Sequence, residues 1–183
     1  MDGKNLLIVV DYQNDFVSGT LGFEGAQRLD LRIAAKIKAY HDAGDVVVFT
    51  YDTHRKNYLN TQEGCKLPVA HCICGTEGWE LYGETAKQQR EEDLCFQKPT
   101  FPSLELADYI SEEEFERIEL VGLVSHMCVL SNAVMAKAAA PEQAEPKAAQ
   151  PKARKPRQGR QTPAKTAANR AAVGRGIPRH DQR

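Results

Sequence analysis

The feature that most constrains this chain is an unbroken aliphatic run, Leu6 to Val10, near its start. A strand that is aliphatic at every position has both faces buried, which is typical of the centre of a parallel sheet. A helical pattern follows over residues 29–41 with Gly44 as its stop signal, and a second strand pattern follows over Val46–Tyr51. This order predicts an α/β domain with three layers, in which helices cover both faces of a parallel sheet.

Both predicted strands end in an acidic residue. Asp11 follows the first strand, and Asp52 follows the second, with His54 two residues further on. Ligands of such sheets bind beyond the carboxyl ends of the strands, so we expect these side chains at one shared edge. A carboxylate that only binds loop amides is the alternative interpretation for Asp11.

A thiol lies at another junction between a strand and a helix. Ile118–Val121 is a short apolar strand pattern, and residues 129–138 have the spacing of a helix packed on one face. Cys128 lies between them, at a helix start whose free N–H groups and partial positive charge would stabilise a thiolate. Cys128 is therefore the candidate nucleophile, and a small buried core residue is the alternative.

The segment over residues 95–117 supplies a candidate lysine. A short strand is predicted over Cys95–Lys98, and helical segments are predicted over 104–110 and 111–117, the second with Ser111 and Glu114 at capping-box spacing. A thiol that attacks an amide must lose a proton and the leaving amine must gain one, so a carboxylate that carries a proton serves both steps. Lys98 beside such a pair would hold the carboxylate and favour the thiolate. This chemistry requires that the three side chains meet.

Composition divides the chain near residue 140. Residues 1–140 hold 13 Lys and Arg against 22 Asp and Glu, whereas residues 141–183 hold 11 against 3. The second part has no aromatic residue and only Val173 and Ile177 as large aliphatic residues. Because such a segment cannot bury enough apolar surface to offset the entropy of ordering, we expect one domain over residues 1–140 and a disordered basic tail over residues 141–183.

Other features concern location. The five cysteines are an odd number, the N-terminus lacks the apolar core and cleavage site of a signal peptide, and no apolar run approaches the roughly 20 residues of a membrane span. We therefore expect a cytoplasmic protein with reduced thiols and no membrane contact. Cys72 and Cys74 lack a second cysteine pair, so a structural zinc site is not expected there.

Five motifs in order over residues 5–139 resemble the isochorismatase-like cysteine hydrolases, the superfamily that includes the nicotinamidases. The motifs are LLIVVDYQNDF, TYDTH, LPVAHCICGTEGWEL, FQKPTF and GLVSHMCVLSNAV. The resemblance implies hydrolysis of a small amide such as nicotinamide through a thioester, without an organic cofactor. It implies a triad on Asp11, Lys98 and Cys128, a cis peptide between Leu123 and Val124, and an oxyanion hole formed by the N–H groups of Val124 and Cys128.

The resemblance also implies a divalent metal, zinc, iron or manganese, bound by Asp52, His54 and His71. Imidazoles and a carboxylate suit these ions, and an open coordination position would hold the ring nitrogen of the substrate. Similar metal-binding nicotinamidases carry another histidine where this chain has Asn60, and commonly a tryptophan where it has Pro68. Ordinary polar loop residues are the alternative interpretation.

Two aromatic residues are candidate walls of the substrate pocket. Phe16 and Trp79, the single tryptophan, lie in the predicted loops, and aromatic faces stack well on flat amides. Ordinary packing under a loop explains them equally well.

The tail departs from the family, which continues past the nucleophile helix with two further strands and helices. Without those strands, the strand at Ile118 becomes an exposed edge. One explanation is a basic tail that adheres weakly to nucleic acid or acidic surfaces. The explanation we favour is a reading-frame change near codon 140, which predicts apolar strand-type runs in a shifted frame of the DNA.

A nicotinamidase-like amidohydrolase is therefore the leading hypothesis. Within the enzyme class, the alternatives are a ureido compound, another small amide or an isochorismate-type ether as substrate. Outside it, the alternative is an inactive, partly folded product whose basic tail binds nucleic acid. A homo-oligomer is compatible with the sequence.

Overall fold

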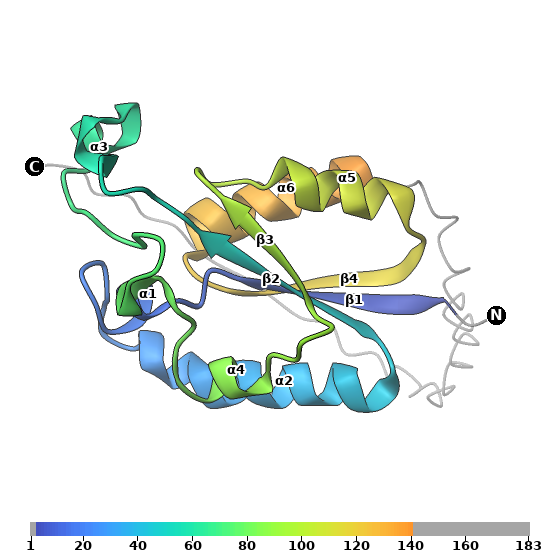
Figure 1. Ribbon diagram of the computed structural model, residues 1–183. Helices are drawn as coiled ribbons and strands as arrows, with labels where there is room; N and C mark the ends of the chain where they lie inside the picture. The colour runs from blue at the N-terminus through green and yellow to red at the C-terminus, as the bar shows by residue number, and fades with distance from the viewer. Residues whose placement is uncertain (1–2, 141–183) are drawn as a thin grey trace, which may run out of the picture. The chain divides into compact units, whose positions relative to one another are not determined.

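A single parallel sheet organises the computed structural model, which describes residues 3–140 (Figure 1). The disorder expected for residues 141–183, and the strands expected to be missing there, lie outside the described residues. The strands pair in the order β3-β2-β1-β4, and all three pairings are parallel. Their bounds are β1 Lys4–Val10, β2 Val46–Asp52, β3 Leu94–Lys98 and β4 Phe115–Gly122.

Helices cover both faces of this sheet (Figure 1). α2 (Asp30–Ala43) and α4 (Gly83–Gln88) lie on one face, and α5 (Leu104–Glu112) and α6 (Leu130–Ala139) lie on the other. The expected α/β class and its three layers are therefore confirmed. Short helical segments fill the loops: α1 Asn14–Val17, η1 Ala26–Leu29, η2 Tyr58–Asn60, α3 Gln62–Lys66, η3 Glu77–Trp79 and the π-helical turn η4 Ser125–Val129.

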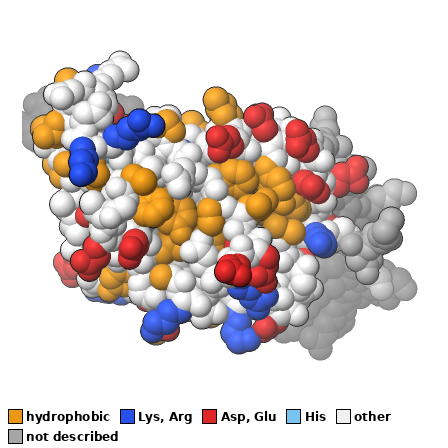
Figure 2. All heavy atoms as spheres, viewed as in Figure 1, with side chains coloured by type: hydrophobic (Ala, Val, Ile, Leu, Met, Phe, Trp, Pro, Cys, Tyr) orange, Lys and Arg blue, Asp and Glu red, His pale blue; other side chains and the backbone are white. Residues whose placement is uncertain are grey.

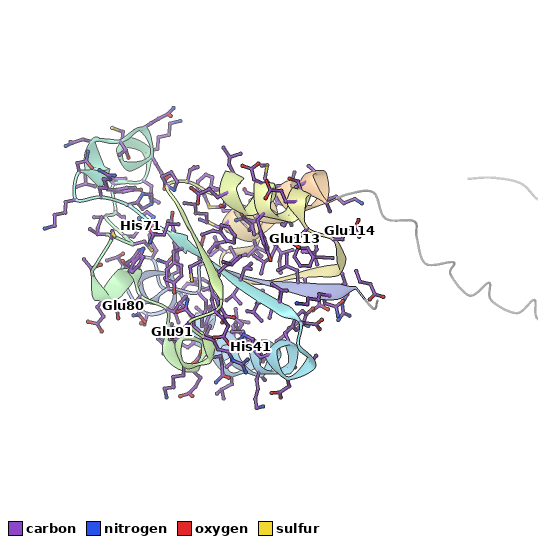
Figure 3. All side chains as sticks on the ribbon, turned by 45° about the vertical axis from the view of Figure 1, so that its right-hand side comes forward. His41, His71, Glu80, Glu91, Glu113 and Glu114 are labelled. Carbon is purple, nitrogen blue, oxygen red and sulfur yellow. The ribbon has the colours of Figure 1, made fainter. Side chains whose placement is uncertain are left out.

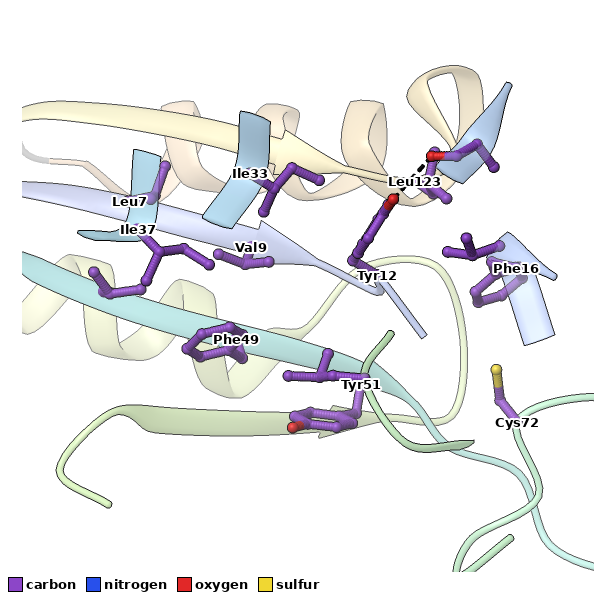
Figure 4. Packing of buried hydrophobic residues seen from close by; sticks show 14 of the residues in the cluster. Leu7, Val9, Tyr12, Phe16, Ile33, Ile37, Phe49, Tyr51, Cys72 and Leu123 are labelled. Atoms are coloured by element: carbon purple, nitrogen blue, oxygen red, sulfur yellow. Dashed lines mark hydrogen bonds between the residues drawn. The ribbon is translucent and has the colours of Figure 1, made fainter. Parts of the chain in front are cut away.

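Strand β1 is the centre of the core, as its aliphatic run predicts. Every side chain from Leu6 to Val10 is fully buried. Because side chains alternate along a strand, Leu7 and Val9 pack with the cluster that includes Ile33 and Ile37 of α2 (Figure 4), whereas Leu6, Ile8 and Val10 pack with residues of α5 and α6. Each such side chain contributes roughly 1.5–3 kcal/mol by its burial.

The stop signal of α2 is also confirmed. Gly44 has a left-handed backbone with φ of 75°, and its N–H donates to the carbonyl of His41. An L-residue rarely adopts this conformation, so glycine is the natural residue at this helix end.

The helix expected over residues 111–117 is wrong. α5 continues to Glu112, and β4 begins at Phe115, whose side chain is buried in the cluster beneath α5 and α6. The hydroxyl of Ser111 donates to the carbonyl of Asp108 instead of capping a helix, and Glu114 lies in the connection to β4 (Figure 3). Local capping chemistry was outweighed by the burial of one aromatic ring.

Strand β4 lies at one end of the sheet formed by residues 3–140. Beside it, a cavity of about 260 Å³ is lined by side chains of β4 and α6, including Ile118, Leu120 and Ala133. Acidic side chains outnumber basic ones on the face shown in Figure 2, in line with the composition of residues 1–140. No helix in the described part of the chain is long and apolar enough to cross a membrane.

Candidate active site

The strand register aligns the candidate residues at the carboxyl edge of the sheet. Asp52 pairs with Lys98 across β2 and β3, and Val10, which precedes Asp11, pairs with Thr50 on one side and with Gly122 on the other. α1 and α3 lie beyond this edge (Figure 1). The parallel arrangement therefore delivers side chains that are far apart in sequence to one place.

The structure brings Asp11, Lys98 and Cys128 together. The Nζ atom of Lys98 lies 2.6 Å from Oδ2 of Asp11 and 3.7 Å from Sγ of Cys128. All three side chains are buried, with exposures of 0%, 1% and 4%. A carboxylate, an ammonium and a thiol thus share a site that is closed to bulk water, where charges interact strongly.

Asp11 is held by its backbone and by a neighbouring strand. Its φ of 45° turns the chain at the end of β1, and its Oδ1 atom accepts a hydrogen bond of 2.7 Å from the hydroxyl of Thr50. Burial raises the pKa of Asp11 above its usual value, although the Lys98 ammonium and the Thr50 hydroxyl oppose the rise. The carboxylate is therefore a better proton acceptor than an exposed aspartate.

The Cys128 thiol does not have the lowered pKa expected from its place at a helix start. Burial and the Asp11 carboxylate raise its pKa well above the usual value, against the opposing charge of Lys98. Desolvation outweighs the helix terminus here because an ionised sulfur would lose its hydration. Burial and the nearby carboxylate thus favour the protonated form of the sulfur.

The turn that carries Cys128 begins at Gly122. This residue has φ of 124°, and a Cβ atom there would lie 1.9 Å from the carbonyl oxygen of Val10. The next N–H group, that of Leu123, donates to the same oxygen at 2.9 Å. The peptide between Leu123 and Val124 is cis, as the family resemblance implies, and the π-helical turn follows directly.

A second cluster lies beside the first. Potential ligand atoms of Asp52, His54 and His71 all lie within 4.8 Å of one another, and all three residues are buried. The Oδ2 atom of Asp52 is 3.2 Å from Nε2 of His54 and 3.3 Å from Nε2 of His71. Nδ1 of His71 bonds to the carbonyl of Val69 at 2.7 Å, which leaves Nε2 directed at the cluster. Two imidazoles and a carboxylate fit zinc, iron or manganese.

Glu63 is a candidate fourth ligand that the sequence analysis missed. Its Oε1 atom lies 3.7 Å from Nε2 of His54 and 4.0 Å from Nε2 of His71. It comes from the first turn of α3, whose N-cap is the Thr61 side chain. The sequence predicted no helix for this segment, and no local signal showed that Glu63 faces the histidines.

Lys98 connects the two clusters. Its Nζ atom lies 3.8 Å from Oδ1 of Asp52, whose other oxygen faces the imidazoles. Burial alone would raise the pKa of Asp52, but hydrogen bonds from His54 and His71 and the charge of Lys98 lower it below its usual range. Asp52 is therefore ionised, and it contributes to the balance of charge around the lysine.

The two aromatic residues pack near the second cluster. The Phe16 ring contacts the His71 ring at 5.6 Å between centroids, and the Trp79 ring contacts Tyr51 at 5.1 Å. The indole nitrogen of Trp79 donates to the hydroxyl of Thr53. Both rings belong to or border the core cluster on the α2 side, so these contacts are those of packed loop residues.

Two cavities open beside these clusters. One of about 470 Å³ is lined by His54, and one of about 350 Å³ is lined by Met127, next to the candidate nucleophile. Gln62, Glu63 and Thr100 line both. The two cavities therefore adjoin each other: one reaches His54 of the second cluster, and the other reaches Met127, the neighbour of Cys128.

Comparison with known proteins identifies the family of the chain. Residues 5–139 match the model of the isochorismatase domain. An uncharacterised isochorismatase family protein, PncA of Bacillus subtilis, is 31% identical over 145 residues, which cover 73% of this chain and 78% of that protein.

Solved structures give the same result. The crystal structure of nicotinamidase/pyrazinamidase PncA from Bacillus subtilis superposes with a TM-score of 0.65 at 30% identity, over 72% of this chain and 77% of that chain. The pyrazinamidase/nicotinamidase from Streptococcus mutans has a TM-score of 0.65 at 28% identity, over 73% and 79%. The pyrazinamidase of Pyrococcus horikoshii in complex with zinc shares the fold, with a TM-score of 0.65 at 24% identity over 74% and 79%.

Fold and comparisons together define a hydrolase of the α/β class, with a buried polar site at the carboxyl edge of a parallel sheet. The chain belongs to the isochorismatase family, as the sequence motifs predicted. The nicotinamidases among its relatives support a hydrolase that acts on the C–N bond of an amide.

The burial and raised pKa of Cys128 predict a slow thiol. Iodoacetamide at neutral pH should label the exposed Cys65, Cys74 and Cys95 before Cys128, because the thiolate is the reacting species. Asp11→Asn removes the negative charge that opposes ionisation, so labelling of Cys128 should become faster. Peptide mass spectrometry over time measures both rates. Faster labelling of Cys128 than of the exposed thiols in the wild type would contradict this electrostatic description.

Proposed function

We propose that this protein is a cysteine-dependent amidohydrolase, nicotinamidase-like, that converts nicotinamide and water to nicotinate and ammonia. The observation that carries the proposal is the buried contact of Asp11, Lys98 and Cys128 in a chain of the isochorismatase family. The relatives named nicotinamidase support the choice of substrate.

The first half of the reaction forms a thioester. The Cys128 proton moves to the Asp11 carboxylate as the sulfur attacks the carbonyl carbon of the amide, which is chemically consistent with the raised pKa of both groups. The resulting oxyanion is bound by the N–H groups of Val124 and Cys128. Asp11 then gives its proton to the nitrogen, the C–N bond breaks, and ammonia leaves.

The second half regenerates the enzyme. Asp11, again a carboxylate, takes a proton from a water molecule that attacks the thioester carbon. The C–S bond breaks, the carboxylic acid product leaves, and the proton on Asp11 returns to the sulfur. Lys98 holds Asp11 in place throughout and stabilises each state in which negative charge lies on oxygen or sulfur.

The second cluster would hold a divalent metal through Asp52, His54 and His71, with Glu63 as a further carboxylate. A bound metal would supply a Lewis-acid position for the ring nitrogen of the substrate. Phe16 packs on His71 and is the nearer candidate for a pocket wall, whereas Trp79 is proposed as a wall behind it.

Removal of the nucleophile or of the proton carrier tests the chemistry directly. Cys128→Ala and Asp11→Asn should each lower ammonia release from nicotinamide to the background rate, since neither variant can form the thioester by this route. A coupled assay for ammonia measures the loss, and circular dichroism shows whether each variant is folded. Ammonia release that persists in folded Cys128→Ala would refute the covalent route.

The pH profile tests the role of Asp11. Its carboxylate must be deprotonated to accept the thiol proton, so kcat/KM should fall as the pH falls through the raised pKa of Asp11. Thr50→Val removes a hydrogen bond that lowers this pKa, so the acidic limb of the profile should move to higher pH. Thr85→Val, which removes a hydroxyl bonded to Asp30, is the matched control and should leave the limb in place. An unmoved limb in Thr50→Val would show that another group titrates.

Metal binding is tested by measuring the zinc content of the protein. Protein stripped with a chelator and dialysed against zinc should retain about one ion per chain. His54→Ala and His71→Ala should retain much less, whereas His126→Ala, which removes an exposed imidazole outside the cluster, should bind as the wild type does. Elemental analysis by mass spectrometry gives the content. Equal zinc content in all four proteins would exclude the cluster as the binding site.

A further inference from the structure

A buried amide connects the nucleophile turn to the loop that follows Lys98. Asn132 lies in the first turn of α6, four residues after Cys128, and its side chain is 1% exposed. Its Nδ2 group donates to the carbonyl of Cys128 at 2.9 Å and to the carbonyl of Phe101 at 3.0 Å. Its Oδ1 atom accepts from the N–H of Ser103 at 3.0 Å. Both amide protons and the carbonyl oxygen are therefore used.

The loop that Asn132 holds also contacts the ammonium of Lys98. Residues 99–103 connect Lys98, the last residue of β3, to α5, and the carbonyl of Thr100 accepts from Nζ of Lys98 at 3.2 Å. The hydroxyl of Ser103 accepts from the N–H of Leu106 and begins α5. The loop is therefore fixed by Lys98 at one end, by a helix cap at the other, and by Asn132 between them.

Few side chains could make this connection. The Asn132 site presents two carbonyl oxygens and one N–H group, which only a carboxamide of this length matches with two donors and one acceptor. An aliphatic residue would leave the three backbone groups without this partner, at a cost of about 1–3 kcal/mol for each group that stays unsatisfied. Asn132 lies within the last of the five motifs, GLVSHMCVLSNAV, but no role was predicted for it from the sequence.

We propose that Asn132 is a positioning residue that sets the distance between the Lys98 ammonium and the Cys128 sulfur. It does so by fixing the carbonyl end of Cys128 against the loop that follows the lysine. The significance for catalysis rests on the proposed amidohydrolase function. The positional claim itself concerns the contact of 3.7 Å between Nζ of Lys98 and Sγ of Cys128. The reactivity of the thiol toward a labelling reagent depends on this contact and can be measured without any amide substrate.

The experiment replaces Asn132 with leucine, which is similar in size and adds no charge. Iodoacetamide labelling of Cys128 is followed across pH by mass spectrometry. In Asn132→Leu the labelling midpoint should move to higher pH, because the ammonium that favours the thiolate is no longer held beside the sulfur. With nicotinamide, kcat should fall by about tenfold or more while KM changes less, as expected for misplaced reacting groups.

A control separates position from stability. Thr85 is fully buried and its hydroxyl donates to Asp30, so Thr85→Val also loses a buried hydrogen bond but lies outside the site. Thr85→Val should lower the melting temperature and leave the labelling midpoint of Cys128 unchanged. An unchanged midpoint in Asn132→Leu as well would overturn the proposal, since Asn132 would then act on stability alone.

A second background tests whether the effect passes through Lys98. Asp11→Asn combined with Lys98→Met removes the ammonium together with its nearest carboxylate partner, which limits the cost of an unpaired buried charge. In that background the added Asn132→Leu should no longer move the midpoint, because the interaction that it modulates is gone. An equal shift in both backgrounds would overturn the proposal.

If the leucine variant does not fold, Asn132→Ser serves in its place with the same expected results. If the wild type releases no ammonia but Asn132→Leu still moves the labelling midpoint of Cys128, the amidase function is refuted and the positional role of Asn132 stands.

Discussion

The buried ammonium of Lys98 is the interaction on which the rest of the site depends. It lies within 4 Å of two carboxylates, a thiol and a backbone carbonyl, which belong to Asp11, Asp52, Cys128 and Thr100. A lysine held at 1% exposure is costly unless its charge is compensated. The carboxylates raise the pKa of Lys98 against the effect of burial, so the charge is retained. Asp11 follows β1, Asp52 ends β2, Thr100 lies in the loop after β3 and Cys128 lies in the turn after β4, so partners from four segments meet at this group.

This charge balance also explains how a slow thiol can serve as a nucleophile. Burial raises the pKa of both Cys128 and Asp11, which favours a neutral thiol and makes the carboxylate a better proton acceptor than an exposed aspartate. Transfer of the proton between them creates no new buried net charge, because one anion replaces another next to the same cation. The site therefore suits a reaction in which the proton moves as the sulfur attacks, and a permanently ionised cysteine is not required.

Sequence patterns predicted an element correctly where several successive residues of that element are buried. The aliphatic run of β1 predicted a strand buried on both faces, and Gly44 predicted the end of α2. The capping pair at Ser111 and Glu114 failed because a single long-range contact, the burial of Phe115, set the start of β4. Likewise, Glu63 and Asn132 were missed, because the sequence does not show that Glu63 faces the histidines or that Asn132 reaches the loop after β3.

The sequence by itself determined the parallel sheet, the order of its elements and the chemical types of the candidate residues, because strand periodicity and residue identity are local properties. Only the tertiary structure decided that Asp11, Lys98 and Cys128 touch, that Asp52 lies between both clusters, and that burial raises the pKa of the thiol. Distances and pKa values depend on which groups share a desolvated space, and that sharing is set by packing between segments up to 117 residues apart, the separation of Asp11 from Cys128.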